Sequence, residues 1–600
     1  MTQNSIGTSK AGYNRFLLLV AGLGGLLYGI DVGIINGALT YLQATFTLPD
    51  GSRLTSEEVS FVAAAVLLGT VISTLFAGLL ADLFGRRTIM SLSGILFVAS
   101  IPMIALAHDY ELLVFGRILQ GISGGLIGVA GPLYLAECLG ASDRGKGTGI
   151  FQWMLVLGLV IAALIAFFYS HRVETVARLG DAVKLFAAKE NAWRDIFWST
   201  LPAGVLFVIG TFLVAESPRW LFRRGQIEAA RAALLRSRDR EQAEMELREM
   251  QETAAEEKNK VSSAGEKIRE SLLRRKYVIP FLLAFIILAC NQATGINSVI
   301  AYNTTTLIQA GLGDQPAHLA SLIFTFVNFG FTPVAVFLVD RVGRKSLLSI
   351  GTAGIVVSMI CIGLLFHQTE QQRFDVRDAV QSMVSTNQTL TLAFNQDTLA
   401  RLLPASAAQH FGAATPFTMT VIYSYGDFGA ATPAQRSDDL SAVPIKISRE
   451  DSVPGNKVEA FFKSPLSNFA AARTAPLKID NALITPVPGT LNGWITAVAM
   501  FVYMAFFAIG PGVCVWLALS ELMPTRIRSN GMSITLVVNQ VVSWTIAAIF
   551  LPTVGKYGYS AMFFFFAGCT VVYFVTAAFF LPETKGKTLE EIEELFEGKK

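Results

Sequence analysis

The feature that most constrains this chain is a set of twelve apolar runs, each about twenty residues or longer. About twenty consecutive apolar residues are enough for a helix to cross a lipid bilayer. The first run is too long and too rich in glycine for a cleaved signal peptide, and we expect it to stay in the protein. The runs lie at 16–39, 58–80, 88–107, 112–138, 147–169, 195–215, 277–309, 317–339, 346–366, 491–519, 529–551 and 559–581. We therefore expect an all-α membrane protein with twelve transmembrane helices.

Composition supports the same conclusion. Hydrophobic residues make up 52% of the 600 residues and charged residues 16%, against roughly 25% charged in a soluble chain. Lipid must cover much of this apolar surface, which argues against a soluble enzyme and against a nucleic-acid-binding protein. The net charge of +3 is too small to indicate an anionic partner. The five cysteines and five histidines are scattered, so we expect no disulfide framework, no metal site and no cofactor.

The basic residues predict an orientation in the membrane, because loops rich in Lys and Arg stay on the cytoplasmic side. Alternate loops carry clusters such as Arg86–Arg87 and Arg344–Lys345, whereas the opposite loops near 108–111 and 552–558 hold few basic residues. The predicted outer loop 170–194 is a minor exception. We expect a multi-pass protein of the bacterial inner membrane with both termini in the cytoplasm.

Two hydrophilic segments interrupt the helices. Residues 222–276 are charged and rich in Ala, Glu and Arg, which predicts one to three cytoplasmic helices that brace the two halves. Residues 367–490 contain β-like runs such as "FTMTVIYSY" and "KVEAFFK", which predict an extracytoplasmic β-rich domain. The expected organisation is a first bundle (1–221), the linker (222–276), helices seven to nine (277–366), the insertion (367–490), helices ten to twelve (491–581) and a cytoplasmic tail (582–600).

The two halves of the chain repeat one another. The segment "GLLADLFGRRTIMSL" at 78–92 resembles "VFLVDRVGRKSLLSI" at 336–350, and Glu137 with Arg144 resembles Glu521 with Arg528 at the same spacing. The two Glu–Arg pairs lie further apart in the chain than the two loop segments do. The difference is about the length of the 367–490 insertion, which lies between the repeated motifs of the second half. Six helices are therefore duplicated, and a pair of parallel six-helix repeats is an architecture of transporters.

The charged residues of these loops form a candidate cytoplasmic gate. Acid–base pairs across the inner face would hold the outward-facing state and break when the halves rock, and each exposed pair contributes about 0–1 kcal/mol. Alternatively, these charges only set the topology. The candidate gate residues are Asp82, Arg86, Arg87, Glu137, Arg144, Glu216, Arg219, Asp340, Arg344, Glu521 and Arg528.

The chain resembles the sugar porters of the major facilitator superfamily, which include bacterial xylose– and arabinose–proton symporters and animal glucose facilitators. The matching segments are "GLLADLFGRR", "PLYLAECLGASDRG", "ESPRWL", "NQATGINSVIAY", "DRVGRK", "GPGVCVWLALSELMPTRIR" and "LPETKGKTLEEI". They occur in family order and cover both halves, but not the insertion. The resemblance implies two pseudo-symmetric six-helix bundles and transport of a monosaccharide, a pentose or a hexose, by alternating access.

The resemblance also implies a sugar site built from polar residues inside the spans. Amide side chains both donate and accept hydrogen bonds, as sugar hydroxyls require, and an indole ring can stack on a sugar. Amides in membrane helices can instead hold helices together, for roughly 1 kcal/mol each. The implied substrate-binding residues are Gln152, Asn291, Gln292, Asn297, Asn328, Trp516 and Asn539.

A charged pair is the candidate proton site. Asp31 lies within the first span and Arg117 begins the fourth, where an uncompensated charge costs several kcal/mol. In proton-coupled members of the family, an Asp and an Arg at these positions face each other and the Asp takes up the proton. The resemblance thus implies that Asp31 carries a proton and that Arg117 tunes its affinity. The alternative is a static buried ion pair.

Other functions are weaker alternatives. "GASDRGKG" at 140–147 nearly matches a phosphate-binding loop, but Gly147 replaces the required Ser or Thr and a membrane helix precedes it, so we expect no ATP binding. The leading interpretation is sugar–proton symport, with a proton-independent facilitator as the main alternative and a sugar sensor as a weaker one. An enzyme is not expected, because the insertion has no nucleophile–base motif.

Overall fold

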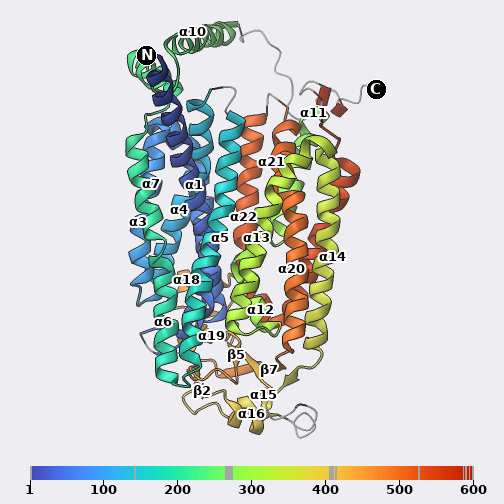
Figure 1. Ribbon diagram of the computed structural model, residues 1–600. Coiled ribbons are helices and arrows are strands. Elements are labelled where there is room, and N and C mark those ends of the chain that lie inside the picture. The colour runs from blue at the N-terminus through green and yellow to red at the C-terminus, as the bar shows by residue number, and fades with distance from the viewer. Residues whose placement is uncertain are drawn as a thin grey trace.

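The computed structural model shows long helices standing side by side, with a small mixed domain at one end (Figure 1). It describes residues 3–49, 51–140, 144–263, 274–403, 411, 415–524, 527–585, 587, 591–592 and 595–596. Among these residues, twelve helical spans are long and apolar enough to cross a membrane. The predicted all-α membrane fold of twelve spans is confirmed. Both termini and the linker lie at the end of the molecule opposite the insertion (Figure 1); we call these ends the linker side and the insertion side.

The first bundle contains six spans. Its helices are α1 (Gln3–Thr45), α2 (Ser56–Phe84), α3 (Arg86–Ala105), α4 (Tyr110–Cys138), α5 (Arg144–Ala177), α6 (Ala182–Trp198) and α7 (Leu201–Leu213), of which α6 and α7 share the sixth span. The prediction of a loop over 170–194 is wrong, because α5 and α6 extend through most of it. The Asp181 side chain accepts hydrogen bonds from the backbone of Val183 and Lys184 and so starts α6 earlier than the apolar run does.

The linker is helical, as the sequence predicted. It contains α8 (Pro218–Arg223), α9 (Ile227–Ser237) and α10 (Arg240–Ser263), and α10 lies across the linker side near the N-terminus (Figure 1). Arg238 fixes it to the first bundle: this buried side chain donates to the Cys138 carbonyl at the end of α4 (2.8 Å) and pairs with Glu246 (2.6 Å).

The second bundle also contains six spans, two of which are interrupted. Its helices are α11 (Arg275–Ala293), α12 (Ile296–Gln309), α13 (Asp314–Val342), α14 (Arg344–Glu370), α20 (Thr490–Ile509), α21 (Pro511–Leu522), α22 (Arg528–Tyr557) and α23 (Tyr559–Val575), with a wider turn at Thr576–Phe580. Gly295, with a φ of 82°, separates α11 from α12 within one span. The pair Gly510–Pro511 separates α20 from α21. Such breaks expose backbone and polar groups in the middle of a membrane protein.

The insertion between α14 and α20 contains two antiparallel sheets. One has the strand order β1 (Phe374–Asp375), β7 (Leu477–Pro486), β3 (Phe417–Tyr425), β4 (Phe428–Ala431), with β5 (Gln435–Arg436) also on β3; the other pairs β2 (Leu390–Leu392) with β6 (Ile445–Ile447). Strand β3 is the predicted run "FTMTVIYSY". Short helices complete the domain: α15 (Arg377–Gln381), α16 (Gln396–Leu402), α18 (Lys457–Lys463) and α19 (Phe469–Ala472). The β-like assignment of "KVEAFFK" is wrong, because Asn456 caps the segment and it forms α18.

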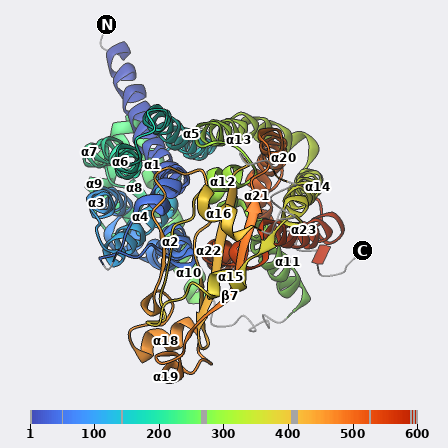
Figure 2. The same ribbon diagram turned by 90° about the horizontal axis from the view of Figure 1, so that it is seen from below.

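The apolar core shows where the bundles meet. On the insertion side, one continuous buried cluster joins residues of both bundles, for example Tyr41 and Val59 with Tyr302 and Phe550. Toward the linker side each bundle has its own cluster, one around Tyr134 and Phe151 and the other around Leu348 and Cys514. The bundles are therefore closed against each other on the insertion side. Figure 2 shows part of the insertion over the line between the bundles, with α18 and α19 projecting beyond the edge of the transmembrane helices.

Candidate substrate and proton site

Three of the predicted amides converge around the break between α11 and α12. The Gln292 amide donates to Asn539 Oδ1 (3.1 Å), and the Asn297 amide donates both to Gln292 Oε1 (3.0 Å) and to Ser543 Oγ (2.7 Å). Asn539 also donates to the Leu288 carbonyl (3.0 Å). Helices α11, α12 and α22 thus contribute one hydrogen-bonded cluster. Ser543 was not among the predicted residues, because a single serine in a membrane helix carries little signal.

The other predicted binding residues lie outside this cluster. Asn291 is buried, and its side-chain oxygen has no hydrogen-bond partner among the described residues. Asn328 accepts from Thr332 one turn later on α13 (2.7 Å to its carbonyl). Gln152 is half-buried on α5, and its neighbour Trp153 stacks on Phe329 of α13 with ring centroids 5.1 Å apart. The Trp516 side chain lies outside the described residues.

The candidate proton carrier is buried within the first bundle. Asp31 is 1% exposed, and neither of its carboxyl oxygens has a hydrogen-bond partner in the part of the chain that the structure describes. A Cβ atom at Gly124 of α4 would lie 2.8 Å from Asp31 Oδ2, so only a glycine leaves space for the carboxyl there. The Tyr28 ring packs against the same glycine, and the Tyr28 side chain interacts with Gln540 of the second bundle.

Arg117 is equally buried but does not form an ion pair with Asp31. Its guanidinium donates to Gln120 Oε1 (2.6 Å) and to the Val62 carbonyl (3.4 Å), and it lies over the Phe197 ring at 5.6 Å. It remains within electrostatic range of Asp31. In this conformation the carboxyl and the guanidinium are therefore neighbours rather than direct partners.

Hydrogen bonds between the bundles close the insertion side. Asn36 of α1 donates to Ser321 Oγ (2.6 Å) and accepts from the Thr304 backbone (2.9 Å). The Tyr302 hydroxyl interacts with Ser60 Oγ of α2 (3.3 Å). The contacts of Asn36, Ser60 and Ser321 were not predictable, because contacts that distant helices make in one conformation leave no local pattern in the sequence.

On the linker side of the first bundle, three of the predicted gate residues form a cluster around the buried Arg86. Arg86 pairs with Asp82 (2.7 Å) and with Glu137 (2.9 Å), and Ser217 donates to Glu137. Glu216 does not pair with an arginine side chain in this cluster: it accepts from the backbone N–H of Arg87 (3.0 Å) at the start of α3.

The second bundle repeats this arrangement. Arg344 pairs with Glu521 (3.1 Å), Thr584 donates to Glu521, and Glu583 accepts from the backbone N–H of Arg344 (3.1 Å). The pair Glu583–Thr584 therefore takes the place that Glu216–Ser217 has in the first bundle. Each arginine–glutamate pair lies within its own bundle, and neither pair crosses from one bundle to the other.

The remaining gate candidates are placed differently. The Arg87 side chain donates to the carbonyls of Thr211 and Phe212 at the end of α7 (both 2.9 Å). Arg219 is exposed. The side chains of Arg144, Asp340 and Arg528 lie outside the described residues.

Comparison with known proteins places these features in a family. The model of the family described as "Sugar (and other) transporter" matches residues 17–394 and 481–596. The chain is 27% identical to the mouse "Solute carrier family 2, facilitated glucose transporter member 12", over 98% of this chain and 88% of that protein. It is also 27% identical to the human "Proton myo-inositol cotransporter", over 96% of this chain and 81% of that protein.

A solved structure of the xylose transporter XylE from E. coli shares the fold. It superposes with a TM-score of 0.63 at 21% sequence identity, covering 96% of this chain and 100% of that chain. The predicted major facilitator fold and the predicted resemblance are confirmed. Since the family model covers most of the chain, including both bundles, the protein belongs to the sugar (and other) transporter family.

Proposed function

We propose that the protein carries a monosaccharide together with a proton across a membrane by alternating access, and that it acts as a transporter rather than as an enzyme. The observation that carries the proton step is the buried Asp31 carboxyl, to which no group in the described part of the chain donates a hydrogen bond. An ionised carboxylate without donors is costly in an apolar interior. The group is thus suited to hold a proton while the bundles are closed on the insertion side.

Arg117 supplies the means of releasing that proton. Its guanidinium bonds to Gln120 and to a backbone carbonyl, and these contacts can be exchanged for Asp31 when the helices move. A direct arginine–carboxylate contact favours the ionised acid. The proposed cycle therefore links loss of the proton to a change in the distance between α1 and α4.

The sugar would bind at the amide cluster of Gln292, Asn297 and Asn539, with Ser543 as an additional hydroxyl. These amides bond to one another, so sugar hydroxyls can replace partners of similar strength. We propose Gln152, Asn291, Asn328 and Trp516 as further contacts from the surrounding helices. The relatives are named for glucose, myo-inositol and xylose, and the sugar of this protein is one such polyhydroxylated ring.

We propose that the charged clusters of the linker side act within this cycle as braces of each bundle, which lets each bundle move as one body. The proposed setting is the bacterial inner membrane, with both termini and the linker in the cytoplasm and the insertion outside. The basic loops of the linker side support this orientation.

The test uses purified protein in proteoliposomes with D-xylose, D-glucose and myo-inositol as probes. The parent should show counterflow of at least one probe and accumulate it when an inward proton gradient is applied. Asp31→Asn should retain counterflow but lose accumulation. Asp378→Asn, which changes an exposed carboxyl of the insertion, is the matched control and should accumulate the probe normally.

Two results would contradict the proposal. Accumulation by Asp31→Asn would remove the proton role of this residue. A parent protein that equilibrates sugar but ignores both the proton gradient and a protonophore would be a facilitator, as the name of the mouse relative describes that protein.

A further inference from the structure

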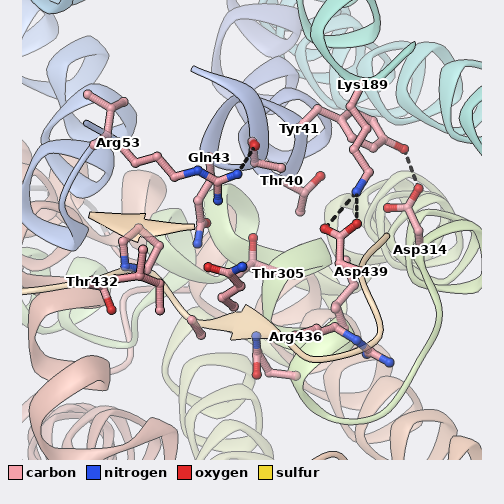
Figure 3. A pocket seen from close by; sticks show the side chains of 18 of the residues that line it. Thr40, Tyr41, Gln43, Arg53, Lys189, Thr305, Asp314, Thr432, Arg436 and Asp439 are labelled. Carbon is pink, nitrogen blue, oxygen red and sulfur yellow. Dashed lines mark hydrogen bonds and ion pairs between the residues drawn. The ribbon is translucent and has the colours of Figure 1, made fainter. Parts of the chain in front are cut away.

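A cavity of about 470 Å³ lies on the insertion side, apart from the amide cluster (Figure 3). Its walls come from α1, α5, α6 and α12 and from the loop that follows β4 in the insertion. Volumes of roughly 300–1,000 Å³ are typical of small-molecule sites. The cavity is therefore large enough for a ligand of monosaccharide size.

The helical wall of the cavity presents two hydroxyl–amide pairs. Thr40 and Gln43 are three residues apart on α1, and Thr305 and Gln309 are four apart on α12, so each pair shares one helix face. Because α1 and α12 belong to different bundles, each bundle contributes one hydroxyl and one carboxamide. A smaller hollow of about 70 Å³ adjoins the same wall and is also lined by Gln43, Thr305 and Gln309.

The two hydroxyls of these pairs are not satisfied by the described part of the chain. Thr305 is 8% exposed, yet its hydroxyl has no hydrogen-bond partner among the described residues, and the buried Thr40 hydroxyl also has none. A buried polar group without a partner is destabilising, because it has lost its hydrogen bonds to water and gained none in exchange. An unpartnered hydroxyl in a polar cavity indicates a ligand or water that supplies the missing bond.

Two ion pairs and a tyrosine–carboxylate hydrogen bond join polar groups of the cavity wall. Lys189 pairs with Asp439 (2.9 Å), Arg436 pairs with Asp438 (2.8 Å), and the Tyr41 hydroxyl donates to Asp314 (2.6 Å). Figure 3 shows the Lys189–Asp439 and Tyr41–Asp314 contacts along one wall. The whole lining carries four basic and five acidic side chains. Such near balance favours a neutral ligand over an anion or a cation.

We propose that this cavity binds a neutral polyhydroxylated molecule of monosaccharide size, at a second site distinct from the amide cluster. The ligand would bridge α1 and α12 and be covered by the insertion. Because these walls come together when the bundles close on the insertion side, the bound molecule stabilises the closed arrangement. The inference goes beyond the proposed transport cycle and does not depend on proton coupling.

The test measures binding rather than transport, with full-length protein in lipid nanodiscs and radiolabelled D-xylose, D-glucose or myo-inositol as probes. A Gln292→Ala/Asn539→Ala variant removes the amide cluster and should retain one saturable equivalent of at least one probe. Adding Gln43→Ala/Gln309→Ala should abolish that remaining equivalent. Adding Gln372→Ala, which changes an exposed glutamine of the same side outside the cavity, should leave it unchanged.

A smaller change guards against misfolding of the multiple variant. Thr305→Val keeps the shape of the side chain and removes only the unpartnered hydroxyl, so the remaining equivalent should bind about five-fold more weakly, as for one lost hydrogen bond. The proposal is overturned if the Gln292→Ala/Asn539→Ala variant binds none of the three probes. It is equally overturned if the remaining binding is insensitive to Thr305→Val and to Gln43→Ala/Gln309→Ala. Both outcomes leave the transport proposal standing, since that rests on uptake and counterflow.

Discussion

The Tyr41 hydroxyl donates a hydrogen bond to the Asp314 carboxylate across the two bundles, with an O–O distance of 2.6 Å. The Tyr41 ring also stacks on His318 of α13, with centroids 5.5 Å apart. Both contacts join α1 to α13 on the insertion side and break when the bundles separate there. They are therefore part of the free-energy difference between the closed and open arrangements of that side.

Replacing Tyr41 by Phe keeps the ring and removes this bond. A hydrogen bond to a charged group contributes roughly 1.5–3 kcal/mol, so Tyr41→Phe should shift the population toward separation of the bundles on the insertion side. Spin labels at Glu111→Cys and Leu491→Cys, in a cysteine-free background, would report this as a longer distance by double electron–electron resonance. Tyr557→Phe, at an exposed ring of the same side, should leave the distances unchanged, and identical distributions in all three proteins would contradict the prediction.

Breaking the ion pair between the buried Arg86 and Glu137 should lower the stability of the first bundle by a large amount. The Arg86 side chain is 2% exposed and the Glu137 side chain 9%. Neutralising Glu137 removes the buried partner of Arg86 and leaves it only the exposed Asp82, and breaking a buried pair costs up to about 3–5 kcal/mol. Glu137→Gln should therefore lower the thermal unfolding temperature of the detergent-solubilised protein markedly.

The control for this change is an exposed ion pair of the same side. Asp239→Asn breaks the contact of Asp239 with Lys10, and the Asp239 side chain is 79% exposed. Exposed pairs contribute less than about 1 kcal/mol, so this variant should unfold close to the parent. Equal unfolding temperatures for Glu137→Gln and Asp239→Asn would show that the Arg86 cluster does not stabilise the bundle.

The sequence could predict the features that depend on local pattern. The twelve spans follow from apolar runs, and the repeated loop motif predicts that Arg86 and Arg344 have equivalent places, which the structure bears out through their glutamate partners. The convergence of Gln292, Asn297 and Asn539 follows the implied substrate set. The resemblance implied seven substrate-binding residues, and hydrogen bonds join only three of them, Gln292, Asn297 and Asn539, into one cluster.

Features that depend on tertiary arrangement were not predictable. The pairing of Arg344 with Glu521 inside one bundle, rather than across the inner face, depends on how α14 and α21 pack. Whether Asp31 touches Arg117 depends on the conformation, and a sequence is common to all conformations. The segment "KVEAFFK" formed a helix because the Asn456 cap outweighs the β preference of its apolar residues.

Gly85, between α2 and α3, is a second position at which we expect a substitution to destabilise the fold. Gly85 has a φ of 99°, and a Cβ atom there would lie 2.3 Å from Glu216 Oε2 and 2.9 Å from its carboxyl carbon. Gly85→Ala should therefore strain the backbone and displace the carboxylate that accepts from the Arg87 N–H. We expect a lower yield of folded protein by size-exclusion chromatography. Gly78→Ala, inside α2 at a place where an added Cβ would meet no neighbouring atom within 4 Å, should behave like the parent or better. Equal loss in both variants would contradict the prediction.

The contact between the insertion and the first bundle predicts a definite dependence on pH. The Lys189 ammonium donates to both carboxyl oxygens of Asp439 (2.9 Å each), and Ser441 donates to the same group (2.7 Å). Burial by itself raises the pKa of Asp439, but the Lys189 charge and these hydrogen bonds outweigh it and hold the pKa below its usual range. A carboxyl with a lowered pKa stabilises the folded contact above its ordinary value of about 4, and this contribution is lost as the pH falls through the lowered value.

Docking of the insertion on α6 should therefore be constant at neutral and mildly acidic pH and weaken only below about pH 4. A spin label at Leu440→Cys, in a cysteine-free background, should become mobile only in that acid range. Lys189→Met should make the label mobile at every pH, because Asp439 then loses its counter-charge. Lys184→Met, which breaks an exposed pair with Asp181 on the same helix, should leave the label immobile at neutral pH. A gradual increase in mobility between about pH 8 and 5 in the parent would instead assign the dependence to a histidine rather than to Asp439.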